Sequence, residues 1–152
     1  MRLLWSIVMV LAVTACTSVP LAPRDADTAA KRFDSPAPGR AALYIVREGY
    51  MISDEVAVLV DQRAAGTLAY DTYLRLELAP GRHDVRAESI ENRQPLAVTT
   101  VQLAAGEIRF VTIANAVFDS PLARAMTEMS AREMPASAGR AAVLSRRLAA
   151  GR

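Results

Sequence analysis

Hydrophobic and polar residues alternate along much of the middle of the chain. Residues 73–78 place a leucine at every second position, with a tyrosine, an arginine and a glutamate between them. Residues 83–89 alternate in the same way, with charged side chains on one parity and Val85 and Ala87 on the other. A period of two is typical of strands that bury one face, so both stretches are predicted to be strands of a half-buried sheet.

Further runs rich in β-branched and aromatic residues have the length of strands. They cover residues 41–47, 56–61, 96–103 and 108–118, and a shorter strand is expected to end at residues 66–68. Turn residues separate the runs, among them Pro80 followed by Gly81, the Ala-Gly-Glu of residues 105–107 and the tight link at residues 61–63. About seven short strands without a helical pattern between them predict a mainly β fold, an antiparallel β-sandwich at residues 40–118.

The C-terminal part, residues 119–152, has a helical pattern. Asp119 or Ser120 can cap a helix that begins at Pro121, and apolar residues follow at helical spacing. Residues 135–139 interrupt the pattern, and residues 141–150 predict a second short helix that ends before Gly151. The arginines of this part are expected on the solvated side, and the alternative is contact with anionic headgroups or lipopolysaccharide phosphates. They are Arg140, Arg146, Arg147 and Arg152.

The first fifteen residues have the order of a secretory signal peptide. Arg2 gives a positive start, residues 3–13 are apolar except for Ser6, and small residues precede Cys16. As a helix with ~1.5 Å per residue the apolar run reaches roughly 20 Å, which is short of the ~30 Å core of a bilayer. A permanent membrane span is therefore disfavoured, and the alternative is a buried N-terminal core helix.

Residues 13–16, Val-Thr-Ala-Cys, resemble the lipobox of bacterial lipoproteins. The resemblance implies signal cleavage between Ala15 and Cys16 and attachment of acyl chains such as palmitate to Cys16. Each buried CH₂ contributes about 0.8 kcal/mol, so two or three chains would hold the protein stably on a membrane. The next residue is Thr17 rather than aspartate, which in Gram-negative lipoproteins suggests the outer membrane, facing the periplasm.

Residues 16–39 are expected to connect the lipidated cysteine to the domain. Pro, Ala, Asp and Ser dominate this segment and no periodicity is sustained. That composition is typical of a flexible tether, whose ends would lie roughly 25 Å apart as a coil. The alternative is a partly ordered strap that packs on the domain with Phe33 as its anchor.

Charge and cysteine content exclude several classes of protein. The formal net charge is +2, falls to +1 when Arg2 is removed, and the basic residues are scattered among acids, which argues against a nucleic-acid partner. The single cysteine cannot form an intramolecular disulfide and has no Cys/His cluster around it for zinc. No motif suggests that Cys16 pairs with His83 as a nucleophile.

His83, the only histidine, is the main candidate for chemistry. It could act as a base or a metal ligand, but an imidazole that bonds the backbone of the neighbouring Pro80-Gly81 turn is favoured. Asp84 would point to the opposite face of the strand, so the pair makes no ligand pattern. Residues 53–55, Ser-Asp-Glu, fit a capping or turn role, and no phosphate loop, nucleophile elbow or metalloprotease helix occurs in the sequence. No catalytic residue, metal or cofactor is therefore predicted.

Two tyrosines near predicted loops, Tyr50 and Tyr70, could line a recognition patch. The alternative is that they are ordinary core or surface aromatics.

The strand and turn pattern resembles the bacterial lipoprotein family called Domain of Unknown Function 2846, and the PEGA-type β-sandwich is similar. The resemblance covers residues 39–116 and rests on turn and core positions. These are Gly39, Ala41, Tyr44, Val46 and Arg47, then Asp61, Gly66, Leu68 and Tyr73, then Pro80, Gly81, His83, Ala105, Gly106 and Phe110. It implies a β-sandwich on a lipid anchor, in a family without an assigned biochemical activity.

The sequence thus predicts a lipid-anchored cell-envelope lipoprotein that is not an enzyme. Its β domain would bind or scaffold an envelope protein or a cell-wall glycan, through loops or a sheet edge. The alternative is an envelope hydrolase with an active site around His83, which requires an acid or a hydroxyl beside the imidazole.

Overall fold

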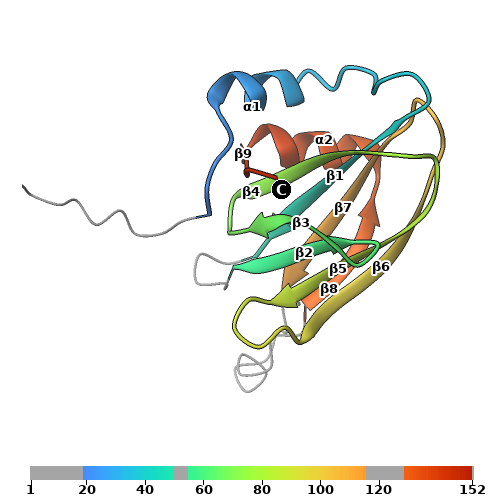
Figure 1. Ribbon diagram of the computed structural model, residues 1–152. Helices are drawn as coiled ribbons and strands as arrows, with labels where there is room; N and C mark the ends of the chain where they lie inside the picture. The colour runs from blue at the N-terminus through green and yellow to red at the C-terminus, as the bar shows by residue number, and fades with distance from the viewer. Residues whose placement is uncertain (1–18, 50–54, 116–128, 152) are drawn as a thin grey trace, which may run out of the picture.

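The computed structural model describes residues 19–49, 55–115 and 129–151 and consists of two β-sheets packed face to face (Figure 1). The five-stranded sheet has the order β8-β7-β1-β4-β9 and the four-stranded sheet the order β3-β2-β5-β6. The first comprises β1 (Ala41–Glu48), β4 (Thr72–Leu78), β7 (Ile108–Asn115), β8 (Met129–Met134) and β9 (Arg147–Leu148). The second comprises β2 (Val56–Val60), β3 (Arg63–Leu68), β5 (Gly81–Ser89) and β6 (Pro95–Leu103). The predicted mainly β sandwich is confirmed.

Most neighbouring strands are antiparallel, but the five-stranded sheet also contains two parallel pairs. β1 runs parallel to β7, and β4 runs parallel to β9. β1 and β7 are separated in sequence by strands of both sheets, so no hairpin constrains this pair to be antiparallel. β1 lies in the middle of its sheet, with β4 on one side and β7 on the other.

The space between the sheets is filled by aliphatic side chains, which we call the inter-sheet core. The alternation predicted for residues 73–78 and 83–89 places Leu74, Val85 and Ala87 there. One detail differs, because Glu88, predicted to face solvent, is buried where the pairing of β5 with β6 shifts between Ala87 and Glu88.

The outer face of the five-stranded sheet is also covered. Helices α1 (Arg24–Ala30) and α2 (Ala136–Leu144) lie across it in Figure 1. Under them lies a group of rings that we call the aromatic layer: Phe33, Tyr44, Tyr73 and Phe110. Because both faces of this sheet are covered, seven consecutive residues of β1 are buried instead of every second one.

The predicted flexible tether is wrong for its described part, residues 19–39. Val19 belongs to the inter-sheet core, α1 follows, and Phe33 packs in the aromatic layer. The alternative of a strap anchored by Phe33 is therefore correct. A segment of low hydrophobicity packs here because its polar groups find partners across the fold, which a search for periodicity does not detect.

The prediction of a short C-terminal helix is confirmed, but its bounds are wrong. α2 begins directly after Pro135 and covers only the first part of the helix expected at residues 141–150, whereas β9 lies in the second part and β8 extends the five-stranded sheet. The backbone N–H groups of Arg147 and Ala149 donate to Asp71 and Tyr73 of the neighbouring turn and strand, which outweighs helix propensity. The sandwich domain therefore includes residues outside 40–118, and the helix predicted from Pro121 lies largely outside the described residues.

The link between β2 and β3 is a two-residue hairpin turn. Asp61 and Gln62 both have positive φ, 50° and 66°, as a type I′ turn requires. Among the helices of the described residues, none has the length and apolar character needed to cross a bilayer.

Candidate functional site

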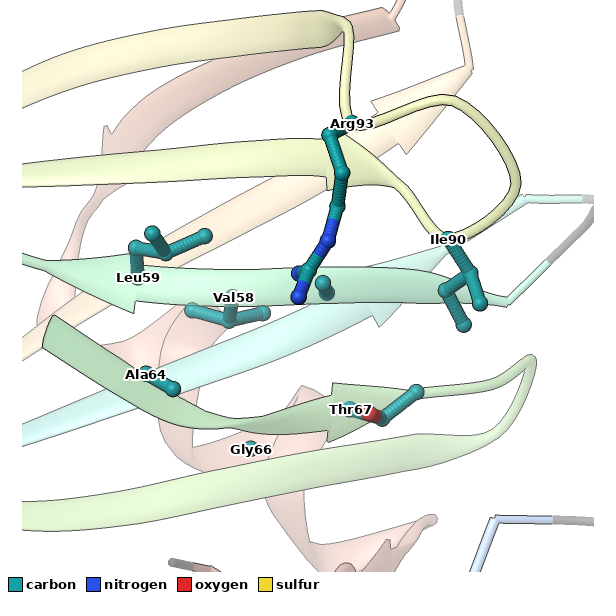
Figure 2. A pocket seen from close by; sticks show the side chains of 8 residues that line it. Val58, Leu59, Ala64, Gly66, Thr67, Ile90 and Arg93 are labelled. Carbon is teal, nitrogen blue, oxygen red and sulfur yellow. The ribbon is translucent and has the colours of Figure 1, made fainter. Parts of the chain in front are cut away.

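A shallow groove lies on the outer face of the four-stranded sheet, over β2 and β3 (Figure 2). Its volume is about 180 Å³, and it is lined by Ala57, Val58, Leu59, Ala64, Gly66, Thr67, Ile90 and Arg93. In Figure 2 the side chain of Arg93 extends from its loop across β2, and Ile90 stands at the end of the groove. The groove thus combines small aliphatic side chains with polar groups, among them the hydroxyl of Thr67 and the guanidinium group of Arg93.

The loop that carries Ile90 and Arg93 connects β5 to β6 and is held by its own backbone. The N–H of Ser89 donates to the carbonyl of Gln94 at 2.9 Å, and the N–H of Arg93 donates to the carbonyl of Ser89 at 3.1 Å. Arg93 itself has a φ of 61°, which is uncommon for a residue other than glycine. These constraints fix the direction in which the guanidinium group leaves the loop.

The same sheet face exposes apolar side chains next to the groove. Val98 on β6 is 54% exposed and Ile90 is 45% exposed. Strand pairing places Leu59, Arg86 and Val98 in one row across β2, β5 and β6. A surface of aliphatic side chains with interspersed guanidinium groups can bind an extended chain through apolar contact and charge-assisted hydrogen bonds.

His83 lies at the start of β5 and contacts two acceptors. Its Nδ1 lies 2.7 Å from Asp61 Oδ2, and its Nε2 lies 2.8 Å from the carbonyl oxygen of Ala79. Burial opposes the charged imidazole, but the hydrogen bonds to Asp61 and Ala79 outweigh it and raise the pKa of His83. The hydrogen bond from His83 is the main reason why the pKa of Asp61 is lowered.

The acid that the hydrolase alternative requires is present, because Asp61 lies beside the imidazole, but the carbonyl of Ala79 occupies the other ring nitrogen, which favours the structural interpretation. A carbonyl oxygen only accepts, so the contact to Ala79 requires a proton on Nε2, and the carboxylate of Asp61 favours a second proton on Nδ1. A doubly protonated imidazole has no lone pair to act as a base or to bind a metal. Asp61 also accepts from the backbone N–H of Asp84 at 3.0 Å, so the pair connects the β2–β3 turn to β5.

Arg47 is a buried side chain with several polar contacts, which the sequence pattern did not indicate. Arg47, in β1, is fully buried and donates to the carbonyls of Glu48 and Ile113 and to the side chain of Asn115. Its carbonyl accepts from Arg146 Nε at 3.1 Å, which connects the end of α2 to β1. The only sequence signal was an arginine directly after a run of apolar residues, which reads equally well as a strand end.

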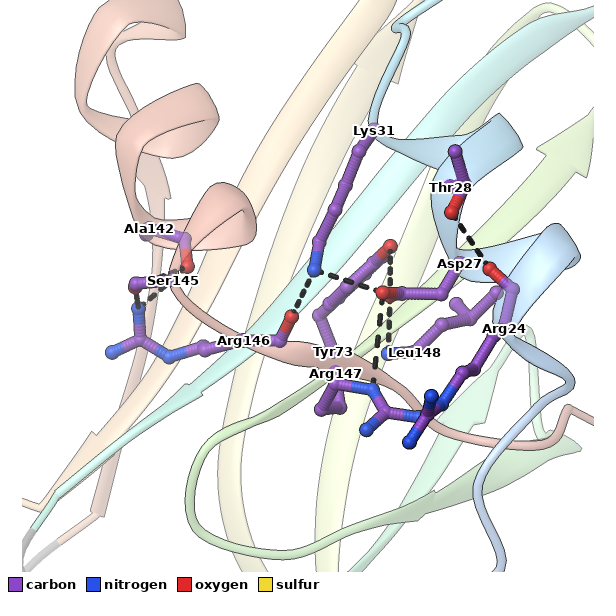
Figure 3. Close-up of polar contacts among 10 residues, drawn as sticks. All are labelled: Arg24, Asp27, Thr28, Lys31, Tyr73, Ala142, Ser145, Arg146, Arg147 and Leu148. Carbon is purple, nitrogen blue, oxygen red and sulfur yellow. Dashed lines mark hydrogen bonds and ion pairs between the residues drawn. The ribbon is translucent and has the colours of Figure 1, made fainter.

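A second polar cluster, the Asp27 cluster, joins the two ends of the described chain (Figure 3). The carboxylate of Asp27 accepts from Lys31 Nζ at 2.9 Å, from the Tyr73 hydroxyl at 2.9 Å and from the N–H of Leu148 at 2.8 Å. Burial opposes ionisation of Asp27, but these three hydrogen bonds hold its pKa below the usual range. Burial and the contact with Asp27 raise the pKa of Tyr73, so its hydroxyl remains a donor.

The residues that the sequence singled out are not gathered into one site. Ala15, Cys16 and Tyr50 lie outside the described residues. Tyr70 lies in the turn between β3 and β4, is 36% exposed, and is not one of the residues that line the groove. Val19, the described residue nearest to Cys16 in sequence, is only 4% exposed.

Comparison with known proteins gives a distant similarity. No family model matches the chain. The chain is similar to an uncharacterized protein of Haemophilus influenzae, with 29% identity over 91 residues that cover 59% of this chain and 54% of that protein. The chain therefore spans about half the length of that relative.

Proposed function

We propose that the chain is a lipid-anchored lipoprotein of the cell envelope, with a β-sandwich that binds or scaffolds another envelope component without catalysis. The observation that carries the proposal is the order of two features: a lipobox-like segment at residues 13–16, followed three residues later by a packed sandwich domain. That order is also the one expected from the resemblance to the Domain of Unknown Function 2846 family. Thr17 after the cysteine supports the outer membrane, on its periplasmic side.

The groove over β2 and β3 is the proposed recognition surface, in place of a patch around Tyr50 and Tyr70. It combines aliphatic and polar lining groups with Arg93, and exposed Val98 and Ile90 extend its apolar part. The proposed ligand is an envelope protein segment or a cell-wall glycan, because both are extended chains that can use apolar contact together with a guanidinium donor. A hydrolase would need one ring nitrogen of His83 free to act as a base. Asp61 supplies the neighbouring acid, but the carbonyl of Ala79 occupies the other nitrogen, which supports a binding role instead.

Anchoring is tested by fractionating cells grown with labelled palmitate, with wild type and Cys16→Ser compared. The wild type is expected to carry label and to sediment with membranes, and the variant to lose the label. Intact-mass analysis that finds residues 1–15 still present and the Cys16 thiol free would refute the anchor.

Recognition is tested separately by crosslinking in intact cells. Arg93→Glu is expected to reduce recovery of a specific envelope partner or of crosslinked glycan, because it reverses the charge beside the groove. Arg132→Glu is the matched control, since Arg132 is an exposed arginine on β8 in the other sheet. Equal recovery with both variants would show that the groove is not the recognition surface.

A further inference from the structure

The distance between Cys16 and the first buried residue is short. Only Thr17 and Ser18 separate Cys16 from Val19, so the two Cα atoms are at most roughly 11 Å apart even when the chain is fully extended. Val19 cannot move away from the domain without leaving the inter-sheet core. An acylated Cys16 would therefore lack the long tether that the composition of residues 16–39 predicted.

The chain after Val19 is fixed as well. The carbonyl of Pro20 accepts from the N–H of Ala150 at 2.8 Å, and the N–H of Ala22 donates to the carbonyl of Leu148 at 2.9 Å. Residues 20–22 thus pair with the end of the chain beside β9, and the Asp27 cluster holds α1 next to them. The segment that follows Cys16 could become longer and more mobile only if these contacts were broken.

We propose, resting on the lipid anchor of the proposed function, that one fixed side of the sandwich lies against the headgroups of the bilayer. This side, the anchor-side surface, consists of Leu21, Arg24, Tyr70 and Arg147. The headgroup layer is about 5–8 Å thick, so a reach of roughly 11 Å from Cys16 brings the side that carries Val19 to the membrane surface.

The side chains of the anchor-side surface suit a headgroup layer. Leu21 and Tyr70 are among the large apolar side chains exposed in the described residues, at 41% and 36%. Tyrosine is enriched at membrane interfaces because its ring is apolar and its hydroxyl polar. In Figure 3 the guanidinium groups of Arg24 and Arg147 extend to the same side of α1, and Arg147 Nε lies 3.8 Å from Asp27 Oδ2.

The contact between the anchor-side surface and the headgroups results from the short segment between Cys16 and Val19, and not from a net positive charge of that surface. Exposed Asp25 in α1 and exposed Asp71 next to Tyr70 balance the two arginines. The contact is therefore expected on zwitterionic vesicles and should depend little on anionic lipid.

The orientation has a consequence for the groove. A backbone bridge joins Gly66 of β3 to Gly151, so β3 lies on the anchor side of its sheet, while β6 is three strand spacings away, ~14 Å. The groove over β2 and β3 would then open close to the membrane surface, which restricts its partner to molecules that reach that surface.

The test uses the acylated mature protein, from Cys16 onward, in phosphatidylcholine vesicles that contain a lipid with a headgroup nitroxide. Acylation consumes the only native thiol, so Leu21→Cys or the control Gln102→Cys on β6 gives a single site for a fluorophore. The label at position 21 is expected to be quenched several-fold more strongly than the label at position 102. Inserting about 20 Gly/Ser residues between Ser18 and Val19 gives a linker of roughly 25 Å and should remove most of that difference.

The outcomes separate the two proposals. If intact mass shows that Cys16 is unmodified, the lipid anchor and the membrane contact both fail. If Cys16 is acylated but the two labels are quenched equally, or the inserted linker changes nothing, the fixed orientation alone is overturned. Tyr70→Cys replaces Leu21→Cys if that variant does not fold, with the same expected result.

Discussion

The two faces of the five-stranded sheet are packed by different kinds of side chain. The inter-sheet core is a cluster of buried aliphatic side chains from both sheets, joined by Val19 and Ala149. The aromatic layer on the opposite face carries hydroxyls that bond to α1: Tyr44 donates to the carbonyl of Ala30 at 2.7 Å, and Tyr73 donates to Asp27. Aliphatic packing stabilises the sandwich without fixing what covers it, whereas the hydroxyls of the aromatic layer specify where α1 lies.

We therefore expect the aromatic layer to contribute to stability as much as the inter-sheet core does. The rings of the aromatic layer come from β1, β4, β7 and the segment after α1, with contacting centroids 5.2–6.1 Å apart, and Ala30 of α1 and Ala142 and Val143 of α2 pack in the same cluster. Aromatic contacts at such distances add to the free energy gained from burial alone. Three predictions test this, and a fourth concerns a polar pair outside both packed regions; they follow in order of decreasing effect on the free energy of unfolding.

The largest effect is expected for Phe110→Ala. The ring is 1% exposed and packs against Phe33 and Tyr44, so its loss should lower the free energy of unfolding by about 4 kcal/mol. Leu43→Ala in the inter-sheet core should cost a similar amount, about 3 kcal/mol. Urea denaturation measures both, with Val98→Ala as the exposed control. A loss below about 1 kcal/mol for Phe110→Ala would mean that the aromatic layer is peripheral.

The second prediction breaks the Asp27 cluster. Asp27→Asn removes a charge that accepts three hydrogen bonds and should cost about 3 kcal/mol, because the partners lose a charged acceptor in a partly buried place. Limited proteolysis should then cut near Lys31 sooner. Asp25→Asn in the same helix is the matched control, since Asp25 is exposed.

The contribution of Asp27 to the free energy of unfolding should decrease as the pH is lowered. The pKa of Asp27 is lower in the folded state than its ordinary value of 3.8, so its contribution is complete above that value and is lost as the pH falls through the folded pKa. Wild type should therefore lose its advantage over Asp27→Asn as the solution is acidified below about pH 4. An advantage that stays constant down to pH 2 would contradict an ionised Asp27.

The sandwich could be predicted from the amino-acid sequence, but the elements that cover its outer face could not. The inter-sheet core was predictable because alternation within one strand already tells which face is buried, as in residues 73–78. The cover was not, because α1 and β9 depend on partners more than a hundred residues away, such as Leu148 for Asp27. The spacing of residues in the β5–β6 loop predicts only a connection between two strands. It does not show that the loop backbone directs Arg93 over β2, so the groove could not be predicted.

The third prediction concerns the contact between α2 and the aromatic layer. A Cβ at Gly139 would lie 2.2 Å from Phe110 Cγ, too close for any atom pair that is not bonded. Gly139→Ala should therefore cost about 2 kcal/mol through overpacking, although alanine is normally the better helix residue by about 1 kcal/mol. The control is Ala141→Gly at an exposed position of α2, where only helix propensity should act. A stabilising Gly139→Ala would mean that α2 does not press on Phe110.

The smallest effect is expected for the polar pair outside both packed regions. His83→Ala removes the contacts with Asp61 and Ala79 and should cost about 1 kcal/mol near pH 5.5, because the side chain of Asp61 is 48% exposed and solvent weakens the pair. Chemical denaturation of wild type and variant at several pH values measures the difference.

The pH profile distinguishes this pair from the Asp27 cluster. The pKa of His83 is raised in the folded state, so its contribution is complete below about pH 6.5 and is lost as the pH rises through the folded pKa. The pKa of Asp61 is lowered, so its contribution is lost as the pH falls below about 4. The effect of His83→Ala should therefore peak between these limits, whereas that of Asp27→Asn persists at high pH. A His83→Ala effect that stays constant up to pH 9 would mean that the imidazole is neutral when folded and keeps a lone pair with which it could act as a base.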